Sequence, residues 1–152
     1  MKSYKNPINK ISSLDSNTSN ASIVVQFTVY TSEEYLSALL NTLEENKLNI
    51  SAYYISEDNK KLKFVFIVGQ NNIQSSGDVN ITRSILKENR FKFNETKVVR
   101  LPISNEIGLL AYHYSELIKT LSVYNSYIGK DGSIIYETCC PTKTLKVVNE
   151  LL

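Results

Sequence analysis

Two stretches of the chain repeat each other at an offset of 74 residues, and this repeat limits the possible folds more than any other feature. Residues 24–29 (VVQFTV) align with residues 98–103 (VVRLPI). Further matches follow at the same offset: Leu36 with Leu110, Leu43 with Leu117, and Tyr53 with Tyr127. The repeat is weak but coherent, and it indicates two similar structural units in succession.

The first unit alternates strand and helix signals. Residues 22–31 are rich in β-branched and aromatic side chains, as a buried strand requires. A helix follows that Ser32 can cap, and its inward face is predicted from leucines at three- and four-residue steps. These leucines are Leu36, Leu39, Leu40 and Leu43.

The rest of the first unit contains two strands, a helix and a further strand. Residues 49–58 and 60–69 read as strands joined by a hairpin at Asp58-Asn59. Asp78 is the expected cap of a second helix, through about Asn89, with Ile81, Ile85 and Leu86 turned inward. Residues 91–103 are long enough for two strand segments in succession.

The second unit repeats this order. It is predicted to contain, after its first strand, a helix at 106–121, strands at 123–129 and 133–139, and a helix at 141–151. Lys130-Asp131-Gly132 is a favourable turn between the two strands. Cys140 falls at the N-cap of the last helix and Pro141 at its first position, where a missing N–H is tolerated.

Each unit therefore reads β-α-β-β-α, with a final strand in the first unit and no clear last strand in the second. This is the split β-α-β order of ferredoxin-like folds. The predicted class is α+β, with two such units in tandem, antiparallel sheets and helices on one face. The predicted domains are a disordered polar tail (1–21), a first domain (22–97) and a shortened second domain (98–152). Because one face of each sheet is left uncovered, a homodimer is also expected.

Composition narrows the range of partners. The chain has 17 basic and 15 acidic residues, a net charge of +2, and no basic cluster, so nucleic acid is not an expected partner. No stretch approaches the roughly 20 apolar residues that span a bilayer, and no secretory signal is visible, so no membrane partner and a cytoplasmic location are expected.

Cysteine and histidine are scarce. Cys139 and Cys140 are neighbours, and with the single His113 they lack the spacing of a tetrahedral metal site. No metal and no cofactor are therefore expected. The cysteines are interpreted as structural or incidental, and His113 as a core or interface residue, although a nucleophilic pair of His113 with either cysteine stays open.

With this element order and the junction FKFNETKVVRLPISNEIGLLAYHYSEL (91–117), the chain resembles tandem ACT-domain proteins, regulatory modules that bind amino acids. In that family a loop of the form Asp-x-Pro-Gly-x-Leu joins the first strand to the first helix. Its glycine lets the ligand approach the backbone, and amides at the helix N-terminus hold a carboxylate. Carried over to the second unit, the resemblance implies a ligand site at Asn105, Glu106, Ile107, Gly108, Leu109 and Leu110.

The two units differ in this loop. In the second unit the glycine and the final leucine match, whereas Ile107 replaces the proline. In the first unit Glu33 and Glu34 stand where Pro-Gly would be, and their charge disfavours a carboxylate ligand. One site is therefore expected, in the second unit, completed by an adjacent unit or subunit. The alternative is that Gly108 only relieves crowding at a tight turn.

Three functions are compatible with these features. The resemblance implies a non-enzymatic regulatory protein, with no catalytic residues, that binds a small amino acid or related metabolite at ACT-domain interfaces. A degenerate ACT-like scaffold for protein–protein interaction is the first alternative. The second is a small enzyme that uses the cleft between the units, with His113 or a tyrosine as acid or base.

Overall fold

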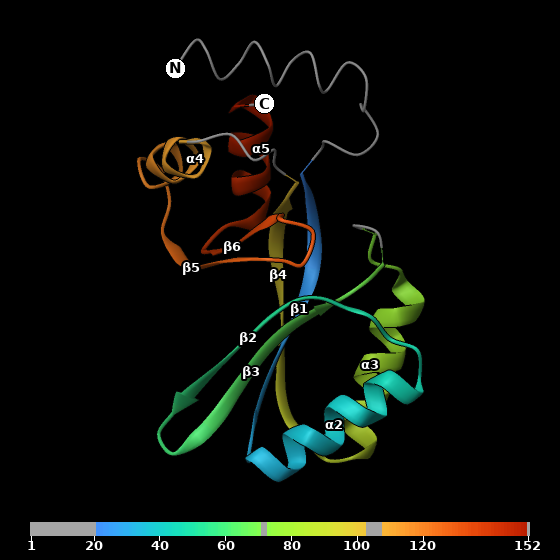
Figure 1. Ribbon diagram of the computed structural model, residues 1–152. Helices are drawn as coiled ribbons and strands as arrows, with labels where there is room; N and C mark the ends of the chain where they lie inside the picture. Colours follow the sequence, from blue (N-terminus) through green and yellow to red (C-terminus); the bar gives the residue numbers. More distant parts are fainter. Residues whose placement is uncertain (1–20, 71–72, 103–107, 152) are drawn as a thin grey trace. The chain divides into compact units, whose positions relative to one another are not determined.

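The computed structural model describes residues 21–70, 73–102 and 108–151 (Figure 1). Apart from Ala21, the predicted polar tail lies outside the described residues. The elements in chain order are β1 (Ser22–Thr31), α2 (Glu33–Glu45), β2 (Ile50–Asp58), β3 (Lys61–Val68), α3 (Ser76–Glu88), β4 (Lys92–Leu101), α4 (Leu109–Leu117), β5 (Val123–Ile128), β6 (Ile134–Thr138) and α5 (Pro141–Leu151). The predicted α+β class is confirmed.

The hydrogen-bonded strands follow the order β2-β3-β1-β4-β6-β5. β3 pairs antiparallel with both β1 and β2, so that Phe66 lies opposite Phe27 on one side and Tyr53 on the other. β6 pairs antiparallel with β4, where Tyr136 lies opposite Val99, and with β5.

The chain divides into two compact units. We call Val25–Thr96 the first unit, and the described residues before Val25 together with those from Lys97 onward the second unit. The long strands β1 and β4 therefore contribute to both units. Where two strand segments in succession are predicted, the described residues form one strand, β4. No strand follows α5 in the described chain; in the strand order, β1 occupies the place beside β4, and its first residues belong to the second unit. The domains predicted at 22–97 and 98–152 stay a prediction.

The core of the first unit is built on stacked aromatic rings. The ring centroids of Phe64 and Phe66 are 4.6 Å apart, and those of Phe27 and Phe66 are 5.5 Å apart. Buried apolar residues of α2 and α3 pack into the same core, so both helices cover one face of the sheet (Figure 1). They are Leu36, Leu39, Leu43, Val79, Ile85 and Leu86.

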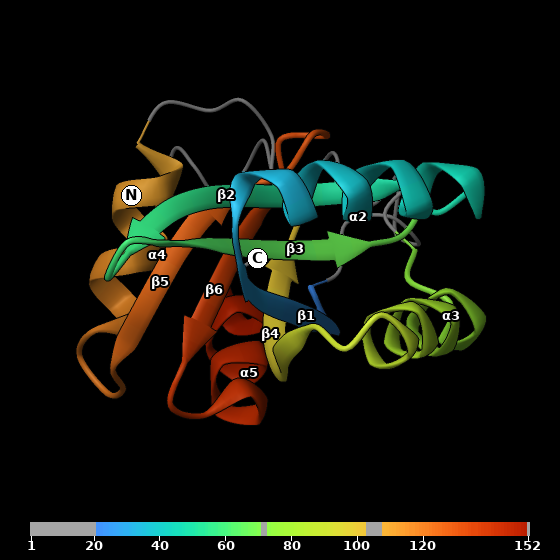
Figure 2. The same cartoon turned by 90° about the horizontal axis from the view of Figure 1, so that it is seen from below.

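The core of the second unit lies between its strands and the helices α4 and α5. Tyr136 and Val99 from the sheet pack with Leu117 of α4 and Val148 of α5, and Ala21 joins them from the start of the described chain. Figures 1 and 2 both show α5 beside β6, in agreement with the contacts between these elements.

The β5–β6 turn is fixed by a polar cluster. Gly132 has a φ of 83°, and the predicted Lys130-Asp131-Gly132 turn is confirmed. The Asp131 carboxylate accepts the backbone N–H and the hydroxyl of Ser133, at 3.1 and 2.7 Å, and pairs with the buried guanidinium of Arg100. Although partial burial raises the pKa of the Asp131 carboxyl, the hydrogen bonds from Ser133 and the charge of Arg100 lower it below its ordinary value.

Several helix details differ from the sequence predictions. α3 begins two residues before Asp78, because Ser75 is the cap: its hydroxyl accepts the Asp78 N–H at 3.0 Å. Ile81 is 43% exposed, since the inward face runs through Val79 and Thr82 instead. α4 covers nine residues and is shorter than the predicted 106–121 helix.

Candidate functional site

Gly108 is the N-cap of α4 and adopts a left-handed conformation, with φ 87° and ψ −6°. A Cβ is disfavoured there, so this backbone conformation favours glycine. Leu109 is buried and Leu110 is 47% exposed. Of the six predicted ligand-binding residues, Asn105, Glu106 and Ile107 lie outside the described residues; the other three stand together at the start of α4.

The start of α4 presents backbone donors. The Gly108 carbonyl accepts the N–H of Tyr112 at 3.0 Å, which is the first bond of the helix. The backbone N–H groups that precede Tyr112 in the first turn of α4 have no acceptor within the helix. The positive end of the helix dipole lies at these groups. The first turn of α4 contains no acidic residue. This turn can therefore receive a carboxylate or another anionic group.

His113 lies one turn further along α4 and is fully buried. Neither of its ring nitrogens has a hydrogen-bond partner among the described residues. Burial lowers the pKa of the imidazole, so the ring is neutral near pH 7 and offers one donor and one acceptor. A buried, unpaired polar side chain is unusual in native proteins and calls for a specific explanation, such as a ligand or an ordered water.

Tyr136 is a second buried polar group in the same unit, and no sequence motif predicts it. Its side chain is fully buried, and its hydroxyl has no partner within the described part of the chain. Burial raises the pKa of the phenol to about 12. The second unit thus contains three buried polar atoms that are unpaired among the described residues: the hydroxyl oxygen of Tyr136 and both ring nitrogens of His113.

The two cysteines occupy a different position. Cys139 and Cys140 are exposed at the start of α5, with their sulfur atoms 3.0 Å apart. Across the described ranges, no hydrogen bond connects either cysteine to His113, and no group of three or more His, Cys, Asp or Glu side chains converges as a metal site would require. The geometry therefore gives no support to a His–Cys nucleophilic pair.

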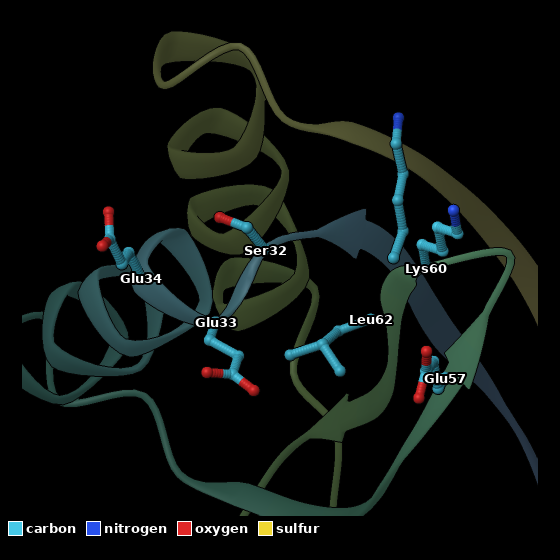
Figure 3. Close-up of a pocket in the computed structure, with 7 residues that line it drawn as sticks. Ser32, Glu33, Glu34, Glu57, Lys60 and Leu62 are labelled. Carbon is cyan, nitrogen blue, oxygen red and sulfur yellow. The ribbon is translucent and has the colours of Figure 1, made fainter.

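The corresponding turn of the first unit has a different character. Ser32 is the N-cap of α2 in an extended conformation, without a side-chain cap bond, and Glu33 and Glu34 occupy the first turn. An open pocket of about 460 Å³ lies beside it (Figure 3). It is lined by Ser32, Glu33, Glu34, Glu57, Lys60, Lys61 and Leu62.

The charges of this pocket are mixed. Figure 3 shows the Glu33 side chain near Leu62, with Glu57 across from it, whereas Lys60 extends away. Lys60 and Lys61 belong to the β2–β3 hairpin and not to the turn between β1 and α2. Carboxylates in the first turn of α2 oppose an incoming anion, so this pocket is a poor counterpart of the Gly108 turn.

Comparison with known proteins supports the fold. No family profile matches the sequence, and no curated protein resembles it at the sequence level. The chain is similar in structure to protein BT0572 from Bacteroides thetaiotaomicron, with a TM-score of 0.73, 22% identity, and coverage of 88% of this chain and 91% of that one.

The regulatory subunits of aspartate kinase are also similar in structure. That of Thermus thermophilus, in a ligand-free form, has a TM-score of 0.55 and 9% identity, and that of Thermus flavus a TM-score of 0.54 and 11% identity. In both comparisons the alignment covers 88% of this chain and 97% of the other. None of the helices in the described ranges is long and apolar enough to cross a membrane. The chain thus has an ACT-like fold of the kind found in aspartate kinase regulatory subunits.

Proposed function

We propose that this protein is a non-enzymatic regulator that binds a small amino acid or a related metabolite at residues 105–110. The observation that carries the proposal is the left-handed Gly108 at the start of α4, because it leads into a helix N-terminus whose first turn contains no acidic residue and whose first backbone N–H groups have no acceptor within the helix. The fold shared with the aspartate kinase regulatory subunits supports the regulatory part of the proposal.

The ligand's carboxylate would bind to the first backbone N–H groups of α4, where Gly108 leaves room for it to approach. The ring of His113, which is buried and neutral, lies one turn away on the same helix and would hydrogen-bond to a polar group of a ligand that displaces its covering. This combination favours a small zwitterion or a 2-oxo acid over a phosphate, since no lysine or arginine stands in the first turn.

Regulation would follow from a difference in affinity between two arrangements of the protein. A ligand shifts such an equilibrium only if it binds one arrangement more tightly than the other. In the proposed homodimer, a second copy of the chain completes the site, so ligand binding changes the stability of the dimer.

A thermal-shift panel of the amino acids and their 2-oxo acids tests the proposal. A ligand at about 100 times its Kd stabilises the folded state by about 2.7 kcal/mol if it does not bind the unfolded state. The proposal expects one stereospecific hit for the wild type and none for Gly108→Trp, provided that the variant remains folded by circular dichroism. Silence of the wild type across the panel would reject it.

An interaction scaffold without a ligand is the second candidate, and the edge strands favour it. β2 and β5 stand at the two ends of the strand order, and both expose apolar side chains. On β5, Tyr124 and Ile128 are 63% and 60% exposed, and on β2 Tyr53 and Ile55 are exposed as well. Exposed strand edges pair readily with other chains. A defined partner bound equally by wild type and Gly108→Trp would favour this function.

A further inference from the structure

The neighbouring thiols of Cys139 and Cys140 are held in place by their backbone. The Cys139 N–H donates to the Ser122 carbonyl at 3.1 Å, and the Cys140 N–H donates to the Thr138 hydroxyl at 3.1 Å. The Cys140 carbonyl accepts both the N–H and the hydroxyl of Thr144, at 3.0 and 2.9 Å. The end of β6 and the first turn of α5 therefore fix both residues.

The two side chains form a donor–acceptor pair that solvent can reach. Both cysteines are exposed, and the Cys140 thiol donates to the Cys139 sulfur at a distance of 3.0 Å. This hydrogen bond is the main reason why the pKa of Cys139 is lowered, with the Ser122 backbone and the charge of Lys143 acting in the same direction. The same hydrogen bond raises the pKa of Cys140. The Cys139 thiol is thus the more readily ionised nucleophile, and the Cys140 thiol stays protonated.

The surroundings favour a thiolate. α5 begins at Pro141, directly after the pair, and has no acidic residue in its first turn. The Lys143 ammonium lies near the thiols and donates to the Thr120 carbonyl at 3.3 Å. A helix N-terminus and a nearby cation are the features that make a cysteine reactive, provided that it is exposed.

We propose that Cys139 and Cys140 form an oxidation site at which a peroxide converts the dithiol into a reversible disulfide within the chain. The Cys139 thiolate attacks one peroxide oxygen, so that an S–O bond forms, the O–O bond breaks, and the departing hydroxide leaves as water. The Cys140 sulfur then attacks the Cys139 sulfenic acid, forming the S–S bond and releasing a second water. In total, two thiols lose two electrons and two protons, and the peroxide is reduced to two waters.

Covalent geometry predicts that this disulfide is easily reduced. The Cα atoms of adjacent residues joined by a trans peptide are about 3.8 Å apart, whereas disulfides usually join Cα atoms about 4.4–6.8 Å apart. Strained, exposed disulfides have more oxidising potentials and are the labile ones. The pair would respond to an oxidant and recover when a thiol reductant is present.

The test uses the full chain, reduced with dithiothreitol, freed of reductant and exposed to hydrogen peroxide. These are the only cysteines in the sequence, so thiol titration reports on this site alone, and intact mass shows whether two hydrogen atoms are lost. The expected product has lost both thiols and two hydrogen atoms. It contains no covalent dimer on a non-reducing denaturing gel, and it regains both thiols with dithiothreitol.

Two single variants separate the roles of the sulfur atoms. Cys140→Ser keeps a hydroxyl donor beside Cys139, and it is expected to stop at a sulfenic acid that dimedone traps. Cys139→Ser is expected to react several-fold more slowly, because the Ser122 backbone helps to lower the pKa of Cys139 and does not act on Cys140. Equal rates for the two variants, a covalent dimer, or direct conversion to sulfinic acid in the wild type would each overturn the proposal. Unchanged melting temperatures of the reduced variants confirm that both remain folded.

Discussion

The two strand-to-helix turns of the chain occupy the same place in their units, yet they are built from different residues. Between β1 and α2, an extended Ser32 leads into Glu33 and Glu34. Between β4 and α4, a left-handed Gly108 leads into a first turn without acidic residues. The charge at the two helix starts therefore differs, and the proposed function assigns an anionic group to the second of them.

The cores of the two units differ in their content of buried polar groups. The first unit packs stacked phenyl rings of Phe27, Phe64 and Phe66 against two helices. The second unit buries His113 and Tyr136, whose polar atoms have no partner in the described part of the structure. Buried polar groups without partners lower stability, so the second unit is expected to be the less optimised of the two and the one that carries function.

The largest effect is expected from removing an aromatic ring in the first unit. Phe66→Ala should lower the free energy of unfolding by about 3–5 kcal/mol, because it leaves a cavity in a fully packed core. Chemical denaturation measures the loss. The matched change in the second unit, Tyr136→Phe, removes only an unpaired hydroxyl and should be neutral or slightly stabilising. A large loss in Tyr136→Phe would show that the hydroxyl has a partner.

The second largest effect on stability is expected from breaking the ion pair of the second unit. Asp131→Asn in the second unit leaves the buried Arg100 without its carboxylate, and it is expected to lower the free energy of unfolding by about 2 kcal/mol. The loss is smaller than for a fully buried pair because the Asp131 side chain is 34% exposed. Its counterpart, Glu95→Gln, breaks the exposed pair with Arg83 in the first unit and should have a smaller effect that added salt removes. Equal, salt-sensitive effects would contradict this difference.

The pH dependence of stability should report on the second unit alone between about pH 6.5 and pH 5. Burial lowers the pKa of His113 from an ordinary value of 6.5, so the unfolded chain takes up the proton first. Stability is therefore complete above pH 6.5 and falls as the pH falls, by at most about 1.4 kcal/mol per pH unit.

His113→Leu should abolish that dependence. The carboxyls of Asp131 and Glu95, whose pKa values are lowered from 3.8 and 4.5, lose their stabilising contributions only as the pH falls through and below those ordinary values. Urea denaturation at several pH values measures the free energy of unfolding in the range of the histidine and in the range of the two carboxyls. A wild-type profile that stays flat down to pH 5 would show that the histidine is not buried in solution.

The smallest effects are expected at the two turns. Gly108→Ala places a Cβ on a left-handed residue and should destabilise by about 1 kcal/mol. Ser32→Gly should change stability by only a few tenths of a kcal/mol, roughly, because Ser32 makes no side-chain cap bond. Thermal unfolding of both variants compares them directly. A Gly108→Ala protein as stable as wild type would remove the conformational requirement for the glycine.

Much of this fold can be predicted from the sequence. Leucine spacing correctly predicts the inward face of α2 at Leu36, Leu39 and Leu43, but it wrongly includes Leu40, which is exposed. Turn residues predict the β5–β6 connection. The sharing of β1 and β4 between the units cannot be predicted in this way, because each is one uninterrupted strand with no local signal at the point where it passes from one unit to the other. Local signals also misplace the start of α3, where Ser75 and Asp78 are both suitable caps.

The candidate site is predicted only in part. Gly108 is visible in the sequence as a glycine between a strand and a helix, and its left-handed backbone agrees with that reading. The unpaired state of His113 and Tyr136 depends on tertiary contacts, for which the sequence carries no local signal.

The most direct test of the central claim is amide hydrogen exchange of the full chain with and without an equimolar mixture of the twenty amino acids and their 2-oxo acids. The proposed function predicts slower exchange at residues 109–112, at the start of α4, and unchanged exchange at residues 33–36, at the start of α2. Unchanged exchange at both helix starts, or protection at residues 33–36 alone, would contradict the assignment of the ligand site to the Gly108 turn.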